Sequence, residues 1–218
     1  HGRSPARLCQ AVFYAGVCVT SAQISSENRK MLDVCRKLAY SYPVLVCANV
    51  TVKEDKKTMM EHKVKIDLEN KRIFITGAAG FIGSNLAKRL LSTVAGVRVV
   101  GLDNMNHYYD VRLKEARLNE LEQFENFRFV KGNLADKALI ESIFEKHRPE
   151  IVVNLGAQAG VRYSITNPDA YVEANLIGFY NILEACRHSY DEGHTPVEHL
   201  VYASSSSVYG SNKKVPYS

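Results

Sequence analysis

From residue 71 onward, short apolar runs alternate with longer segments whose apolar residues recur at helical spacing. This alternation is typical of βαβ units, in which crossover helices join parallel strands. The predicted strands are 72–76, 97–103, 127–131, 151–155 and 199–203, and the predicted helices are 81–92, 110–121, 136–147 and 168–189. Right-handed crossovers would wind them into an α/β fold, a doubly wound parallel sheet with strand order 3-2-1-4-5. We expect a ligand crevice outside the carboxyl ends of the first and fourth strands.

Apolar residues also indicate which faces of these elements are buried. In the predicted helix 110–121, Val111, Leu113, Leu118 and Leu121 fall roughly on one face, which we expect to pack on the sheet. The unbroken apolar start of the strand 151–155 is typical of a strand that is covered on both faces.

Residues 1–70 carry no motif, although 24–40 could form an amphipathic helix and 42–47 a strand. A charged run at 53–57 precedes two methionines, so we expect residues 1–58 to be an upstream addition or a mistranslated leader. The predicted domains are an extension of unknown role at 1–70 and a partial α/β domain at 71–218. Because the chain begins with His and ends in a polar stretch, we interpret it as a fragment.

Composition narrows the function without defining it. Hydrophobic residues make up 46% and charged residues 23%, which is ordinary for a globular protein. The formal charge of +5 is scattered, so neither nucleic acid nor membrane binding is expected. Five cysteines without a Cys-x-x-Cys motif favour a reducing compartment, and we expect a cytoplasmic protein. The seven histidines show no metal-ligand spacing, so no metal site is predicted, and the apolar segment 8–19 is too short to span a membrane.

Three glycines lie between the first predicted strand and the helix that follows it. Gly77, Gly80 and Gly83 form a Gly-x-x-Gly-x-x-Gly turn, one residue wider in its first gap than the common dinucleotide-binding motif. A side chain at Gly77 or Gly80 would hold a pyrophosphate away from the backbone N–H groups, and one at Gly83 would push the helix off the strand. The helix N-terminus would add a partial positive charge. The alternative interpretation is an ordinary strand-to-helix turn.

Asp103 closes the second predicted strand, twenty positions after the last of these glycines. A carboxylate at this place would accept hydrogen bonds from an adenosine ribose and repel a 2′-phosphate, which favours NAD over NADP. The alternative is a helix cap or a turn carboxylate. The other polar clusters also follow strand ends, at Asn104, at Asn133, at 156–164 and at the serines 204–207. A serine hydroxyl there could share a proton with a substrate hydroxyl, unless the serines form only a polar turn.

Four stretches, 76–83, 102–104, 155–164 and 202–210, together resemble the extended short-chain dehydrogenase/reductases, and among these the bacterial UDP-glucuronate 4-epimerases. The resemblance covers about residues 71 to 218. It implies a Rossmann-like domain with a tightly held NAD that takes a hydride from C4 of a UDP-sugar and returns it to the opposite face. UDP-glucuronate would thereby become UDP-galacturonate without net redox change. A homodimer is also implied.

The resemblance implies a role for each matching residue. Those expected to bind NAD are Gly77, Gly80, Phe81, Ile82 and Gly83 at the pyrophosphate, Asp103 and Asn104 at the ribose, Asn133 and Leu134 at the adenine, and Leu155, Gly156, Ala157 and Gln158 beside the nicotinamide. Asn133 stands where the family usually has Asp, but its carbonyl can still accept from the adenine amine. The sequence Asn-Leu-Gly-Ala at 154–157 stands where the family often has His-Leu-Ala-Ala.

Fewer residues of this chain are expected to contact the substrate. Ser205 matches the catalytic Ser/Thr of the family, Ser206 its substrate-binding neighbour, and Arg162 would complement a uronate or phosphate. The alternative for Arg162 is an ion pair with Asp169 or Glu173.

The catalytic Tyr-x-x-x-Lys pair of the family is expected on the helix after the fifth strand, beyond the last residue of this chain. Tyr209 and Lys213 cannot replace it, because Lys213 follows a glycine in a loop. We therefore expect a cofactor half-site without full activity. Other candidates are a nucleotide-sugar 4,6-dehydratase, a UDP-glucuronate decarboxylase and a non-catalytic NAD-binding module. The first two families carry acidic residues where Ser206 and Ser207 stand, which argues against both.

Overall fold

The computed structural model describes residues 67–160, 162–204, 210, 211 and 213. The predicted helix at 24–40, the predicted strand at 42–47 and the serines 205–207 lie outside the described residues.

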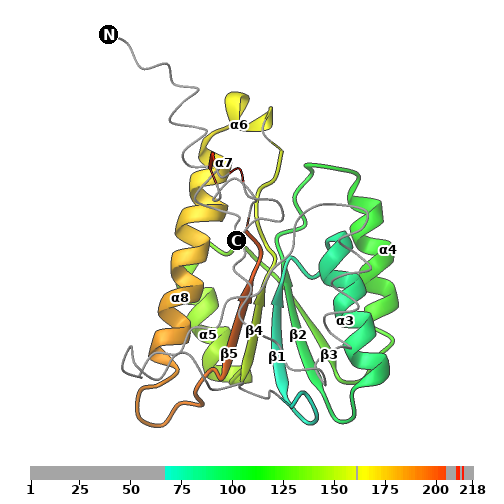
Figure 1. The fold of residues 1–218 in the computed structure, drawn as a ribbon. Coiled ribbons are helices and arrows are strands. Elements are labelled where there is room, and N and C mark those ends of the chain that lie inside the picture. The colour runs from blue at the N-terminus through cyan, green and yellow to red at the C-terminus, as the bar shows by residue number, and fades with distance from the viewer. Residues whose placement is uncertain (1–66, 161, 205–209, 212, 214–218) are drawn as a thin grey trace.

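Five parallel strands form one sheet in the order β3-β2-β1-β4-β5, as predicted (Figure 1). Their bounds are Arg72–Thr76 for β1, Arg98–Asp103 for β2, Phe127–Lys131 for β3, Ile151–Asn154 for β4 and His199–Tyr202 for β5. Every predicted strand end is therefore within one residue of the observed end. The final residue of β1, Thr76, lies between Leu102 of β2 and Asn154 of β4, so the carboxyl ends of these three strands meet at one edge of the sheet.

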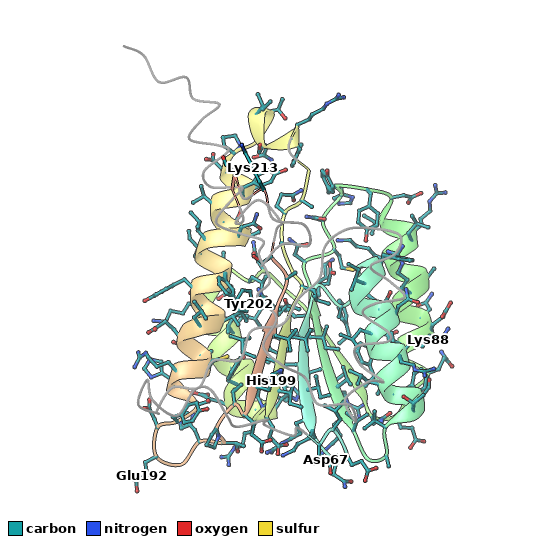
Figure 2. All side chains as sticks on the ribbon, viewed as in Figure 1. Asp67, Lys88, Glu192, His199, Tyr202 and Lys213 are labelled. Atoms are coloured by element: carbon teal, nitrogen blue, oxygen red, sulfur yellow. The ribbon has the colours of Figure 1, made fainter. Side chains whose placement is uncertain are left out.

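Helices cover both faces of the sheet. The helices α3 (Phe81–Thr93) and α4 (Val111–Leu121) pack on one face, and α5 (Lys137–His147) and α8 (Gly178–His188) pack on the other (Figure 1). Successive residues of a strand point to opposite faces of the sheet. Ile73 and Ile75 therefore belong to the core under α3 and α4, and Phe74 belongs to the core under α5 and α8. Side chains fill the space between the sheet and its helices (Figure 2). The apolar runs in the strands thus reflect burial on both faces.

The buried face of α4 differs from the expected one. Leu118 and Leu121 are buried as predicted, but the side chain of Leu113 is 51% exposed, whereas Lys114 is only 5% exposed. Asp110 caps the helix by accepting a hydrogen bond from the backbone N–H of Arg112 at 3.0 Å. The helix that begins there turns a lysine toward the edge of the sheet where the strands end.

The predicted helix 168–189 is observed as one helical run from Asp169 to His188, but its middle six residues wind as a π-helix. A short helix, α6 (Tyr163–Thr166), comes first. It is followed by α7 (Asp169–Tyr171), the π-helix η2 (Val172–Ile177) and α8. A Cβ on Gly178, the first residue of α8, would come within 2.6 Å of Leu134 Cβ. The close approach of this segment to the β3–α5 loop, together with the polar contacts of Asn175 described below, accompanies the wide π turn. Such turns within helices occur often at functional sites.

Candidate functional site

A pocket of about 660 Å³ opens at the carboxyl ends of the strands. Its lining includes Tyr163 of α6 and Ala170 of α7. These helices lie at the end of the sheet toward which β5 runs from His199 to Tyr202 (Figures 1 and 2). Ten of the predicted cofactor residues line it: Gly77, Gly80, Asp103, Asn104, Asn133, Leu134, Leu155, Gly156, Ala157 and Gln158. The residues Phe81, Ile82, Gly83 and Arg162 are not among those that line it. Ser205 and Ser206 lie outside the described residues.

The glycine turn is shaped by close backbone contacts. Gly77 has φ of +68°, and a Cβ there would lie 2.9 Å from the backbone nitrogen of Gly156 on the β4 side of the pocket. A Cβ on Gly83 would lie 2.2 Å from the carbonyl oxygen of Gly77. The first helical turn therefore packs directly on the glycine turn, much as predicted for Gly83, although the contact is with the turn and not with the strand.

The start of α3 suits an anion. An α-helix leaves its first N–H groups without intrahelical acceptors, and Gly80 at the N-cap supplies no side chain to satisfy them. These groups lie at the N-terminal end of a helix of 13 residues, beside the pocket-lining Gly77 and Gly80. A helix N-terminus of this kind can bind an anion such as a phosphate group. Phe81 points elsewhere: its ring is 48% exposed and lies 5.8 Å from the guanidinium of Arg117.

The hydroxyl of Thr76 links the end of β1 to the end of β4 and the loop that follows it. The residue is fully buried, and its Oγ1 donates to Asn154 Oδ1 at 2.6 Å. The same oxygen accepts hydrogen bonds from the backbone N–H groups of Leu155 at 3.1 Å and Gly156 at 2.9 Å. The loop after β4 is thereby fixed against the end of β1, where the glycine turn begins.

Asp103 is buried, and both of its carboxylate oxygens accept hydrogen bonds from neighbouring groups. Its Oδ2 accepts from the backbone N–H of Ala79 in the glycine turn at 3.2 Å. Its Oδ1 accepts from the N–H of Met105 at 2.9 Å and from Lys114 Nζ at 3.0 Å. Lys114 also donates to Asn106 Oδ1 at 3.1 Å and lies 5.3 Å from the centre of the Tyr109 ring. The carboxylate thus stands between the glycine turn and a buried ammonium group.

Lys114 is a pocket residue that the sequence interpretation missed. Lysine usually faces solvent, so hydrophobic periodicity does not assign it to the buried face of a helix. The available signal was its spacing, since Lys114 lies four and seven positions before Leu118 and Leu121, the two buried leucines of α4.

Asn133 and Glu173 also line the pocket. Asn133 Oδ1 accepts from the backbone N–H of Ala135 at 3.0 Å, and its Nδ2 donates to Glu173 Oε1 at 2.7 Å. An amide oxygen has two lone pairs, so the predicted contact with an adenine amine stays open to this side chain. Arg162 is exposed, and among the ion pairs of the described residues none joins it to Asp169 or Glu173.

Side chains of α7 and η2 hold the loop after β4 by hydrogen bonds. Asn175, which is buried, accepts from the backbone N–H of Gln158 at 2.8 Å and donates to its carbonyl at 3.0 Å. Tyr171 donates to the carbonyls of Ala159 and Gly160, and burial raises the pKa of its phenol, which keeps it protonated as a donor. Neither Asn175 nor Tyr171 was predicted, because a polar residue in a helical segment carries no sign of its partner.

A polar contact also joins the loops that follow β2 and β4. Asn106 Nδ2, from the loop after β2, lies 3.4 Å from Gln158 Oε1, from the loop after β4. Nearby, the rings of Tyr108 and Tyr163 are 5.2 Å apart between centroids. Two loops from opposite halves of the sheet therefore meet over the pocket.

Two features are absent from the described residues. No group of three His, Cys, Asp or Glu side chains there is placed to hold a metal ion. No helix within those same ranges has both the length and the apolar character needed to cross a membrane.

Proteins of known family and structure include relatives of this chain. The family model described as GDP-mannose 4,6 dehydratase matches residues 74–218. The chain belongs to this family. Protein CapI of Staphylococcus aureus is 50% identical to this family member over 147 residues, which are 67% of the chain and 41% of the relative. A probable UDP-glucuronate 4-epimerase of Rhizobium meliloti is 47% identical over 146 residues, 67% of the chain and 40% of the relative.

A solved structure of the same kind also matches this member of the GDP-mannose 4,6 dehydratase family. It is UDP-glucuronic acid 4-epimerase from Bacillus cereus in complex with UDP-glucuronic acid and NAD, with a TM-score of 0.57, 30% identity, and coverage of 66% of this chain and 43% of that one. The resemblance to extended short-chain dehydrogenase/reductases of the epimerase type is thus confirmed. The chain spans about two fifths of the length of the curated relatives that it matches.

Proposed function

We propose that this chain is the NAD-binding half of a nucleotide-sugar 4-epimerase that converts UDP-glucuronate to UDP-galacturonate. The observation that carries the proposal is the convergence, in one pocket, of the glycine turn, Asp103 and the loop 155–158. Similarity to a Bacillus cereus epimerase that was solved with NAD and UDP-glucuronic acid supports both the cofactor and the substrate.

Backbone and side-chain groups of the pocket would bind different parts of the cofactor. The N–H groups at the start of α3 would hold the pyrophosphate, and Gly77 and Gly80 leave room for it. Asp103, with Asn104 beside it, would accept from the adenosine ribose, and Asn133 with Leu134 would flank the adenine. Residues 155–158, fixed by Thr76 and Asn175, would line the nicotinamide. When bound, NAD would supply an acceptor for a hydride from the sugar C4 and the donor that returns it.

The substrate side rests on residues that follow β5. Ser205 would share a proton with the oxygen on C4, and Ser206 would lie next to the sugar. Arg162, which is exposed at the start of α6, is our candidate for pairing with a uronate or phosphate group. We further propose a cytoplasmic homodimer, which the odd cysteine count and the family resemblance support.

The test is turnover by the full-length protein. Incubation with UDP-glucuronate should give UDP-galacturonate, resolved by chromatography, with no lasting change in absorbance at the NADH maximum. A 4-keto-6-deoxy sugar would indicate a dehydratase, and a pentose with release of CO₂ would indicate a decarboxylase. Binding of NAD without conversion of any UDP-sugar would favour the non-catalytic module.

Cofactor choice gives a second, independent test. In titration calorimetry we expect NAD(H) to bind more tightly than NADP(H), because the carboxylate of Asp103 faces the glycine turn. Equal or tighter binding of NADP would contradict the ribose assignment.

A further inference from the structure

Lys114 places a positive charge inside the pocket. The side chains of Lys114 and Asp103 are each only 6% exposed, and their ion pair of 3.0 Å lies in the pocket wall. A second hydrogen bond, to Asn106 Oδ1, fixes the ammonium group at 3.1 Å. With two fixed acceptors and a ring beside it, this lysine has one orientation and is not a mobile surface charge.

The order of the groups matters for the ligand. Asp103 Oδ2 bonds the glycine turn, and Oδ1 bonds Lys114. A dinucleotide seated on the turn would therefore meet the carboxylate first and the ammonium behind it. Since the two charges nearly cancel, a further negative charge at this place would be repelled much less than by an isolated carboxylate.

A 2′-phosphate is the negative charge that distinguishes NADP from NAD, and a phosphate monoester carries about −1.5 to −2 at neutral pH. We propose that Lys114 is a specificity-determining residue that weakens the rejection of the 2′-phosphate by Asp103. This inference rests on the proposed function, because it requires the adenosine ribose of a dinucleotide to bind at Asp103. The pocket then prefers NAD by a modest margin, and the margin depends on the balance of two charges.

Four proteins test how the charges at residues 103 and 114 set the preference between NAD and NADP. They are the natural protein, Lys114→Met, Asp103→Asn and the double variant. For each, calorimetry gives Kd for NAD and for NADP, and the measured quantity is the ratio Kd(NADP)/Kd(NAD). Lys114→Met should raise the ratio about tenfold, because the carboxylate is left uncompensated. Asp103→Asn should lower it about tenfold and make NADP the preferred ligand. The double variant, again neutral in sum, should return to within about threefold of the natural ratio.

Matched controls separate charge from structure. Lys114→Arg keeps the charge and should keep the ratio. Lys88→Met makes the same chemical change at an exposed lysine of α3, which pairs with Glu120 of α4 at 2.5 Å, and should leave the ratio unchanged. If Lys114→Met alone fails to fold in a thermal-unfolding check, the comparison of Asp103→Asn with the double variant still tests the inference. Those two variants differ only in the charge at residue 114.

The outcomes are distinct. A ratio that stays constant while both affinities fall together would show that Lys114 only supports the fold, and would overturn the inference while leaving NAD binding intact. A natural protein that binds neither dinucleotide would overturn the inference together with the proposed function.

Discussion

Replacing Thr76 by valine tests whether one hydroxyl holds the two halves of the site together. Valine has nearly the same shape as threonine, so the packing of this fully buried residue should persist. The change removes the donor to Asn154 Oδ1 and the acceptor for the N–H groups of Leu155 and Gly156. Three polar groups therefore lose a partner at once.

The magnitude follows from these three groups. A buried polar group left without a hydrogen bond costs about 1–3 kcal/mol. The loop after β4 borders the pocket, so water can replace part of the loss, and we expect roughly 2–4 kcal/mol in the free energy of unfolding. For a chain of this size that corresponds to a fall in Tm of roughly 5–15 °C. The affinity for NAD should fall as well, because Leu155 and Gly156 line the pocket.

Denaturant unfolding of the purified protein measures the change. Thr93→Val is the matched control, since Thr93 is exposed at the end of α3 and its hydroxyl bonds only the carbonyl of Arg89 at 2.8 Å among the bonds described for it. It should change stability by no more than about 0.5 kcal/mol. Thr76→Ser, which keeps the hydroxyl and loses a methyl group, should cost about 1 kcal/mol. The reasoning fails if Thr76→Val is as mild as the control, or if Thr76→Ser is the more damaging of the two changes at this position.

Two further outcomes are expected. In the full-length protein, Ser205→Ala should lower turnover by roughly 10²-fold while NAD remains bound, because a positioned proton-transfer partner is lost. Ser207→Ala should lower turnover much less. Equal turnover with and without the Ser205 hydroxyl would refute the role of Ser205. Burial lowers the pKa of His199 below its ordinary value of 6.5, so the unfolded chain takes up a proton that the folded chain does not, and stability should decrease as the pH falls below about 6.5. His199→Gln should reduce that pH dependence in denaturant unfolding measured at several pH values, and an unchanged slope would show that this histidine is not responsible.

The strands and their order followed from the sequence because apolar runs and short connections leave few alternatives. The end of β2 illustrates this: the run closes at Asp103, and in a parallel sheet that position must lie at the edge shared with Thr76. The pocket edge could therefore be located from the pattern alone.

What the sequence could not show was which polar groups pair inside the fold. Lys114 and Asp103 are eleven residues apart, and nothing in their spacing indicates that the lysine folds back onto the carboxylate. The same holds for Asn175 and Gln158, whose contact lies where π-helical turns replace the regular winding of the predicted helix. Hydrophobic periodicity measures average burial over several turns, so it detects neither a single wide turn nor a buried ion pair.

The wide turn in η2 also bears on how the length of this segment can vary during evolution. Six residues wound as a π-helix turn through about the same angle as five residues of an α-helix, so deleting one residue between Val172 and Ile177 would restore regular winding and leave α8 in nearly the same orientation. The buried face of α8 with Ile182 could then stay on the sheet, whereas the contact between Asn175 and the backbone of Gln158 lies in the altered turn. A gap of one residue in this segment would therefore act on the pocket before it acts on the core.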